Sequence, residues 1–118
     1  MPAYFFNIEC VIVQGDQRSY TVGPWVSTTG APVDVSTWDV YFKAESIKTT
    51  DTIVIAPAAV IFKDSGSGTV DTFEIPMSES QTNIDPGYYR QEIAVDRGGV
   101  VNTIAKGTLT IVERLTEV

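Results

Sequence analysis

Few side chains in this sequence have the chemistry that catalysis requires. The 118 residues include no histidine, which removes the most common general base and a usual zinc ligand together. The single cysteine, Cys10, lies within an apolar stretch, where a small core residue is expected more often than a nucleophile. Carboxylate pairs can hydrolyse glycosidic bonds without histidine, but Asp39 and Glu45 alternate with apolar residues and should point into solvent. The sequence therefore predicts a protein that is not an enzyme, with no catalytic residues and no cofactor.

One segment has oxygen-bearing side chains that suit calcium. Asp64, Ser65, Ser67 and Asp71 surround a glycine-rich turn. Calcium loops place acidic ligands at alternate positions, and this segment does not. We therefore interpret it as a hairpin loop and predict no metal site.

Length and charge limit the number of domains and the kinds of partner. We take residues 1–118 as one domain, since two ordinary domains need a longer chain. The net charge of -7 repels phosphate backbones, so no nucleic acid is expected as a partner. The first residues lack a basic region, and no apolar run approaches the roughly 20 residues of a membrane span, so neither a signal peptide nor a membrane partner is expected.

Alternation of apolar and polar residues with period two predicts strands along most of the chain. It is clearest at 38–46, where Trp38, Val40, Phe42 and Ala44 should face the core. The predicted strands cover residues 4–13, 19–26, 38–46, 52–55, 60–62, 69–75, 88–95 and 100–112. Seven or eight short antiparallel strands with frequent turns predict an all-β, immunoglobulin-like β-sandwich.

Local signals add detail to this sandwich. Ser78 and Gln81 have the spacing of a capping box, which predicts one helical turn. Tyr89 begins a late strand where sandwiches often fix a corner with a tyrosine hydroxyl. The inward residues change parity between Ile104 and Leu109, and a bulge near Lys106–Gly107 would reconcile them because glycine tolerates the left-handed conformation.

The first predicted strand is apolar on both faces, which is unusual for a strand at a chain end. Phe6, Ile8, Cys10 and Ile12 share one face, and Phe5, Val11 and Val13 make the other face apolar too. We therefore predict that residues 1–14 form an interface strand. The candidate interface residues also include aromatic side chains that suit protein contacts; the complete set is Tyr4, Phe5, Val11, Val13, Trp25 and Tyr41.

Two stretches combine turn and strand signatures. The first is Thr29-Gly30-Ala31-Pro32-Val33-Asp34-Val35-Ser36, followed by the strand that begins at Trp38. The second runs from Ile84-Asp85-Pro86-Gly87-Tyr88-Tyr89 through Gly98-Gly99 to Ala105-Lys106-Gly107-Thr108-Leu109-Thr110-Ile111. Together they resemble the small immunoglobulin-like domains of tailed-bacteriophage virion proteins, most of all the N-terminal domain of baseplate upper proteins and short stand-alone tail proteins. The resemblance covers roughly residues 15–116 and departs at Gln91 and in 48–63.

The resemblance implies a virion structural protein: a tail, baseplate or connector component, or a capsid decoration. It implies other virion proteins as partners, in a homo-oligomer or symmetric lattice, and a place in the virion after synthesis in the host cytoplasm. A second interpretation stays open, in which exposed aromatic side chains make the chain a carbohydrate-binding or adhesion module.

Overall fold

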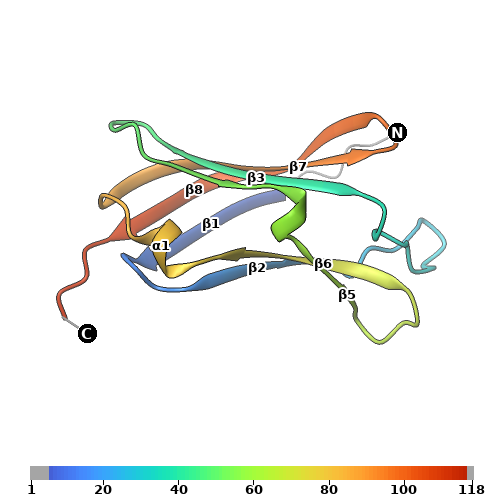
Figure 1. The fold of residues 1–118 in the computed structure, drawn as a ribbon. Coiled ribbons are helices and arrows are strands. Elements are labelled where there is room, and N and C mark those ends of the chain that lie inside the picture. Colours follow the sequence, from blue (N-terminus) through green and yellow to red (C-terminus); the bar gives the residue numbers. More distant parts are fainter. Residues whose placement is uncertain (1–5, 117–118) are drawn as a thin grey trace.

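Two β-sheets face one another in the computed structural model, which describes residues 6–116. In chain order the strands are β1 (Phe6–Val13), β2 (Arg18–Val22), β3 (Asp39–Ser46), β4 (Thr52–Ile55), β5 (Ile61–Asp64), β6 (Val70–Met77), β7 (Gly87–Arg97) and β8 (Val100–Val112). Figure 1 shows the larger sheet, in the order β1-β8-β7-β3-β4, above the smaller sheet, β2-β6-β5. The predicted all-β sandwich is confirmed, and the two sheets match the immunoglobulin-like arrangement.

The core lies between the sheets and is built from the residues that point inward, which are alternate residues along each strand. In β3, Val40, Phe42 and Ala44 are buried and the residues between them are exposed, as the alternation predicted. Trp38 lies just before this strand and is half-buried against the core. The opposite wall comes from β6, where Phe73, Ile75 and Met77 are buried. Removal of these apolar side chains from water is the main source of stability.

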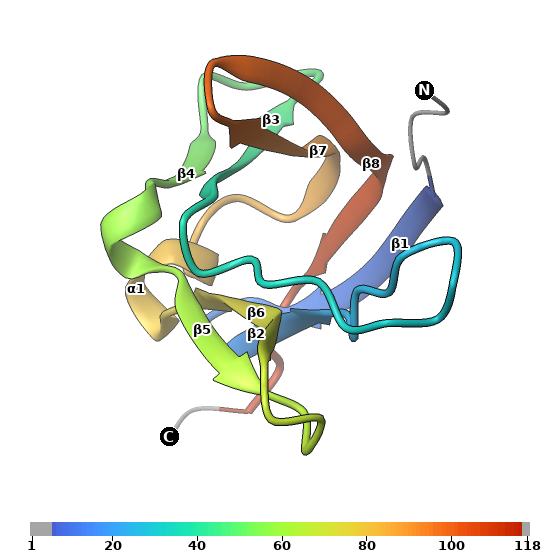
Figure 2. The same cartoon turned by 90° about the vertical axis from the view of Figure 1, so that its right-hand side faces the viewer.

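Short helical segments connect the sheets. The 3-10 helix η1 (Pro57–Ala59) joins β4 to β5, and Figure 2 shows this connection passing from one sheet to the other. The one-turn helix α1 (Glu79–Thr82) begins with the predicted capping box, in which Ser78 Oγ accepts from Gln81 N and Gln81 Oε1 accepts from Ser78 N. The predicted tyrosine corner is also confirmed, because the Tyr89 hydroxyl donates to the Asp85 carbonyl at 2.7 Å.

The first strand departs from the predicted antiparallel arrangement. β1 pairs with β8 in parallel, from Phe6 opposite Ala105 to Val13 opposite Val112. Parallel neighbours need a long crossover connection, and here the rest of the domain supplies it. Figure 1 shows both strands running toward the end of the sandwich that carries the C-terminus. The other pairs of described strands are antiparallel.

The predicted bulge position was wrong. The register between β7 and β8 shifts so that Ile93 faces Ala105 and Ala94 faces Thr103, which leaves Ile104 as the extra residue. Ile104 and Ala105 are consecutive and both buried, and this is how the strand changes parity. Gly107 lies in regular pairing and does not adopt a positive φ. A bulge needs an extra residue but no glycine, so the glycine did not mark its position.

Candidate functional site

The outer face of the five-stranded sheet carries a group of apolar side chains at one end, of which all are exposed except Val13, which is half-buried. Val11 and Tyr88 both lie opposite Thr110, so the three residues follow one another across β1, β8 and β7. Val11 is 62% exposed and Tyr88 is 60% exposed. Next to them lie Val13 and Val112, which pair with each other, and Ile47, whose amide donates to the Tyr88 carbonyl. We call this group the apolar row: Ile47, Tyr88, Val11, Val13 and Val112.

Beside the apolar row the same face is charged, with signs that alternate in both directions. Across the sheet, Lys43 faces Glu92, and Glu92 faces Lys106. In the neighbouring line, Glu45 faces Arg90. These side chains surround a shallow hollow of about 320 Å³. Cross-strand pairs of opposite charge stabilise a sheet modestly. Each charged side chain in this region therefore faces one of opposite charge on a neighbouring strand.

The edge of the sheet beyond the apolar row is open. β8 is the only strand that pairs with β1 among residues 6–116. An unpaired edge presents backbone N–H and C=O groups that can accept another strand. The apolar row and this open edge meet at Val11, which belongs to both.

Close backbone contact fixes the position of β1. A Cβ atom at Gly107 would overlap the Ile8 carbonyl oxygen, so any larger residue would push β1 away from β8. Glycine is required here because the two backbones approach closely.

A buried glutamine supports the same contact from the core. The Gln91 side chain donates to the Ile8 carbonyl at 3.3 Å and to the Thr108 carbonyl at 3.2 Å. Its Oε1 accepts from the Tyr20 hydroxyl at 2.6 Å. Gln91 is 2% exposed, and a buried amide needs such partners. This side chain therefore connects β1, β8 and the opposite sheet, which explains why a polar residue stands among inward apolar ones.

The candidate interface residues that the structure describes do not form one surface. Val11 and Val13 belong to the apolar row, and Tyr4 and Phe5 lie outside the described residues. Tyr41 is exposed on the same sheet face but pairs with Ala94, six residues beyond Tyr88 along β7, or about 20 Å away. The sequence prediction omitted Ile47, Tyr88 and Val112, although the outward parity of Tyr88 and Val112 on their strands was a usable signal.

Trp25 lies in an aromatic cluster elsewhere in the molecule. It packs edge-to-face against Trp38 at 5.2 Å and stacks on Phe73 at 6.3 Å. The Arg97 guanidinium covers the Trp38 ring at 5.2 Å. A sugar-stacking platform needs an accessible ring face, and the Trp25 and Trp38 rings are half-buried against the core. Their packing serves the core and a cation–π contact.

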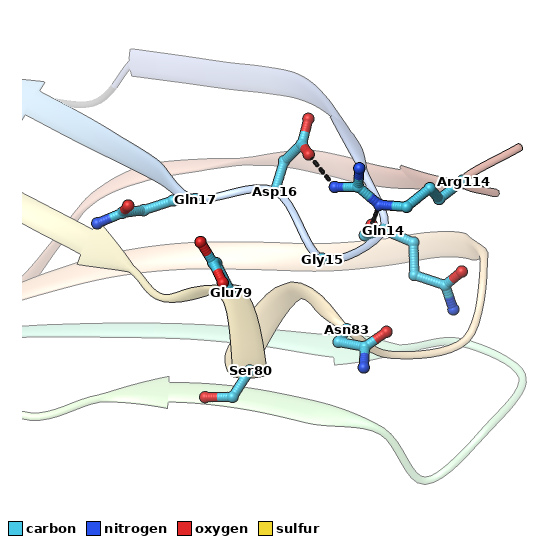
Figure 3. A pocket seen from close by; sticks show the side chains of 8 residues that line it. All are labelled: Gln14, Gly15, Asp16, Gln17, Glu79, Ser80, Asn83 and Arg114. Carbon is cyan, nitrogen blue, oxygen red and sulfur yellow. Dashed lines mark hydrogen bonds and ion pairs between the residues drawn. The ribbon is translucent and has the colours of Figure 1, made fainter. Parts of the chain in front are cut away.

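A polar pocket of about 480 Å³ lies at the end of the sandwich near the C-terminus. Figure 3 shows Arg114 reaching the turn between β1 and β2, where it forms an ion pair with Asp16. Arg114 Nε also donates to the Gln14 carbonyl at 2.9 Å. The Thr82 hydroxyl of α1 donates to the Asp16 carbonyl at 2.6 Å. These contacts join the turn, α1 and the segment after β8, so Arg114 and Asp16 hold this end of the sandwich together.

The segment considered for calcium uses its oxygen atoms internally. The buried Asp71 carboxylate accepts from Ser65 N, Ser65 Oγ and Ser67 Oγ at 2.8–3.0 Å. Burial raises the pKa of this carboxyl, but the hydrogen bonds from Ser65, Ser67 and Thr72 together outweigh it and lower the pKa to about 2. In residues 6–116 no three acidic, cysteine or histidine side chains gather closely enough to hold a metal ion. Asp71 thus organises the β5–β6 hairpin loop.

Neither helix in the described part of the chain has the length and apolar character of a membrane-spanning segment.

No protein-family model matches the sequence, and no curated protein matches it. Similar solved structures include InlP of Listeria monocytogenes, at 16% identity over 92% of this chain with a TM-score of 0.47. The N-terminal domain of phage TP901-1 ORF48 aligns over 94% of this chain and 98% of its own, at 10% identity and a TM-score of 0.48. A family 123 glycoside hydrolase from Clostridium perfringens aligns over 92% of this chain, at 14% identity and a TM-score of 0.41. This chain spans 27% of the InlP chain and 23% of the hydrolase chain. At these values the likenesses assign no function.

Proposed function

We propose that this chain is a structural component of a tailed-bacteriophage virion and that it acts through protein–protein contacts. The phage setting is supported by the two stretches of turn and strand signatures at 29–36 and 84–111. The signatures include Gly30 and Gly87, which adopt φ values of +86° and +148° at turns. Few other residues tolerate this backbone. The signatures therefore describe turns that the fold uses.

The observation that carries the contact role is the apolar row at the open edge of β1. Exposed apolar patches on soluble proteins often mark interaction sites, and unpaired strand edges favour strand addition. The chain combines both at Val11. A component held in a tail, baseplate, connector or capsid surface needs such a surface, and a symmetric assembly repeats it for every copy.

The proposal includes a role without catalysis. The chain has no histidine, and Asp16 in the polar pocket is paired with Arg114. A nucleophile with an adjacent base, or two opposed carboxylates, would be needed for the common hydrolytic mechanisms.

The proposal is tested by the protein content of purified particles. Virions of the phage whose genome encodes the chain are banded by density and washed in high salt. Their proteins are then measured by quantitative mass spectrometry. We expect the chain at a fixed ratio to the major capsid protein after the wash, while an abundant host cytoplasmic protein is depleted. Loss of the chain together with the host protein would overturn the proposal. Gold-labelled antibodies on intact particles then distinguish the tail from the head.

A further inference from the structure

The backbone of β1 has a defined set of groups directed at the open edge. The Ile8 carbonyl points toward β8, since it lies at Gly107 and accepts from Gln91. The Gln14 amide also points that way, because it donates to the Val112 carbonyl at 2.8 Å. Backbone groups alternate in direction along a strand. Asn7, Glu9 and Val11 therefore direct their N–H and C=O groups away from β8.

This edge is the least protected one in the described fold. β1 pairs over eight residues without a register shift, and its one charged side chain is Glu9. β4 has four residues, β5 carries Lys63 beside a register shift, and β2 begins with Arg18. Short length, lysine and irregular pairing are the usual protections of an edge strand. β1 is longer than the other edge strands, pairs regularly and has Glu9 as its one charge, which is expected of a strand that is covered in the assembled state.

We infer that β1 pairs antiparallel with β1 of a second copy of this chain, so that two five-stranded sheets become one continuous sheet of ten strands. The inference rests on the proposed assembly role and names the partner at the same surface. It follows from the residues that would face one another if two β1 strands paired antiparallel. With the two-fold axis at Cys10, Glu9 lies opposite Val11 of the second copy and Ile8 lies opposite Ile12.

Alternative registers are less favourable for this strand. A two-fold axis at Glu9 would place two glutamates directly opposite, which destabilises a pair of strands. An axis at Val11 shortens the ladder within Phe6–Val13. The axis at Cys10 also gives the hydrogen-bonded positions to Glu9 and Val11, whose backbone groups point to the edge. It places Val11 diagonally across the join from Val11 of the second copy, within reach of a side-chain contact, while Val13 lies opposite Asn7.

The size of this interface sets the expected affinity. Pairing of one strand from each copy buries less surface than the roughly 1,200–2,000 Å² of a stable complex. We therefore expect a weak dimer of the isolated protein whose population rises with concentration. In a symmetric particle the same contact would act together with others, and weak contacts then suffice.

Charge changes at Val11 test the register directly. Val11→Glu places a glutamate opposite Glu9 of the other copy, so the dimer would contain two such like-charge pairs. Val11→Lys places a lysine at the same position and gives two pairs of opposite charge. We expect Val11→Lys to dimerise at least about tenfold more tightly than Val11→Glu in sedimentation equilibrium. Val54 is a matched control, because it is 60% exposed on β4 of the same face. Val54→Glu and Val54→Lys should differ little from each other.

Cys10 provides a second measurement, since it is the only cysteine. In the inferred register the two Cys10 residues form a pair without hydrogen bonds, with Cα atoms about 4.5 Å apart. That distance is within the range of a disulfide. Diamide, which takes two electrons and two protons from the two thiols, should link the wild-type protein into a dimer. Val11→Glu should link slowly, and Cys10→Ser should not link.

Two results would overturn the inference: a monomer at every concentration with no diamide-linked dimer, or equal dimerisation of Val11→Glu and Val11→Lys. Each variant is first checked for unchanged circular dichroism and thermal midpoint. Either result would leave the proposed virion role intact, because that role is measured on particles. Conversely, absence from washed particles would overturn the virion role whatever the isolated protein does.

Discussion

The two edges of the five-stranded sheet are each held by a tyrosine hydroxyl, but in different ways. At the β1 edge, the Tyr20 hydroxyl contacts Gln91, whose amide holds the backbone of β1 itself at Ile8. At the β4 edge, the Tyr89 hydroxyl contacts the Asp85 carbonyl and lies 3.3 Å from an Asp51 carboxylate oxygen. The first network is neutral and includes a strand carbonyl. The second includes a carboxylate and holds loops.

The difference reflects how each edge strand is connected. β4 follows β3 after a hairpin loop of residues 47–51, so chain connectivity already places it beside its neighbour. β1 lies beside β8, which is at the other end of the sequence, and no short connection holds the two together. Close approach at Gly107 and hydrogen bonds from Gln91 perform that task instead. The strand that we infer to be used for assembly, β1, is therefore held in place by contacts with Gly107 and the buried Gln91.

The largest expected effect is at the β1 edge, with Gly107→Ala. The added Cβ would overlap the Ile8 carbonyl, so β1 must move and the protein should lose about 3 kcal/mol of unfolding free energy. Urea denaturation measures the loss, and hydrogen exchange should show faster exchange of the β1 amides. Thr110→Ala on the outward face of the same strand is the control and should change stability by about 0.5 kcal/mol or less. Equal stability of the two variants would contradict the proposed role of Gly107.

The next effect is the loss of the buried amide. Gln91→Leu leaves the Tyr20 hydroxyl without its partner, and we expect a loss of about 2 kcal/mol. Tyr20→Phe alone should cost about 1 kcal/mol. Because the two groups contact each other, the double variant should be more stable than the sum of the single losses predicts. A double-mutant cycle measures this coupling, and strictly additive losses would show that the two side chains act separately.

A smaller and more local effect is expected at the β4 edge. Tyr89→Phe removes the hydroxyl and should cost about 1 kcal/mol, since Asp85 and Asp51 lie where water can replace it. Hydrogen exchange should increase around 47–51 and 85–88 while the β1 amides keep their protection. Faster exchange at β1 would show that the two edges are not independent.

The smallest effect appears only in alkaline solution. Burial and the nearby Asp51 carboxylate raise the pKa of Tyr89 to about 12, and burial raises that of Tyr20 as well. The neutral hydroxyls therefore stabilise the fold fully below about pH 10, where the unfolded chain is also protonated. This contribution is lost as the pH rises from about 10 through 12, because the unfolded chain releases the proton first. Asp51→Asn should reduce the loss at Tyr89, measured by urea denaturation along a pH series.

The fold class was predictable because period-two alternation has a direct physical cause. Successive side chains of a strand point to opposite faces, so Val40, Phe42 and Ala44 revealed an inward face without any knowledge of the neighbours. The capping box at Ser78 and the corner at Tyr89 were predictable for a similar reason. Their contacts lie within three or four residues along the chain.

Predictions that depended on distant contacts were less successful. Gly107 was interpreted as the site of a bulge because glycine has a flexible backbone. A glycine is required there for another reason: the backbone of Ile8, far away in sequence, leaves no room for a side chain. The bulge formed at Ile104 instead, where no glycine marks it. Gln91 was noticed as an exception, but its role depends on Tyr20, Ile8 and Thr108 together.

The sequence alone determined the strands, the residues that face inward and the shortage of catalytic groups, because each depends on local geometry or on composition. Only the tertiary structure decided that β1 lies parallel to β8, that its second edge is open and that an apolar row crosses three strands to reach it. Alternation specifies the face on which a side chain lies, but it does not specify which strand is its neighbour. That choice depends on how the whole core packs, and it determines where Val11 meets an open edge.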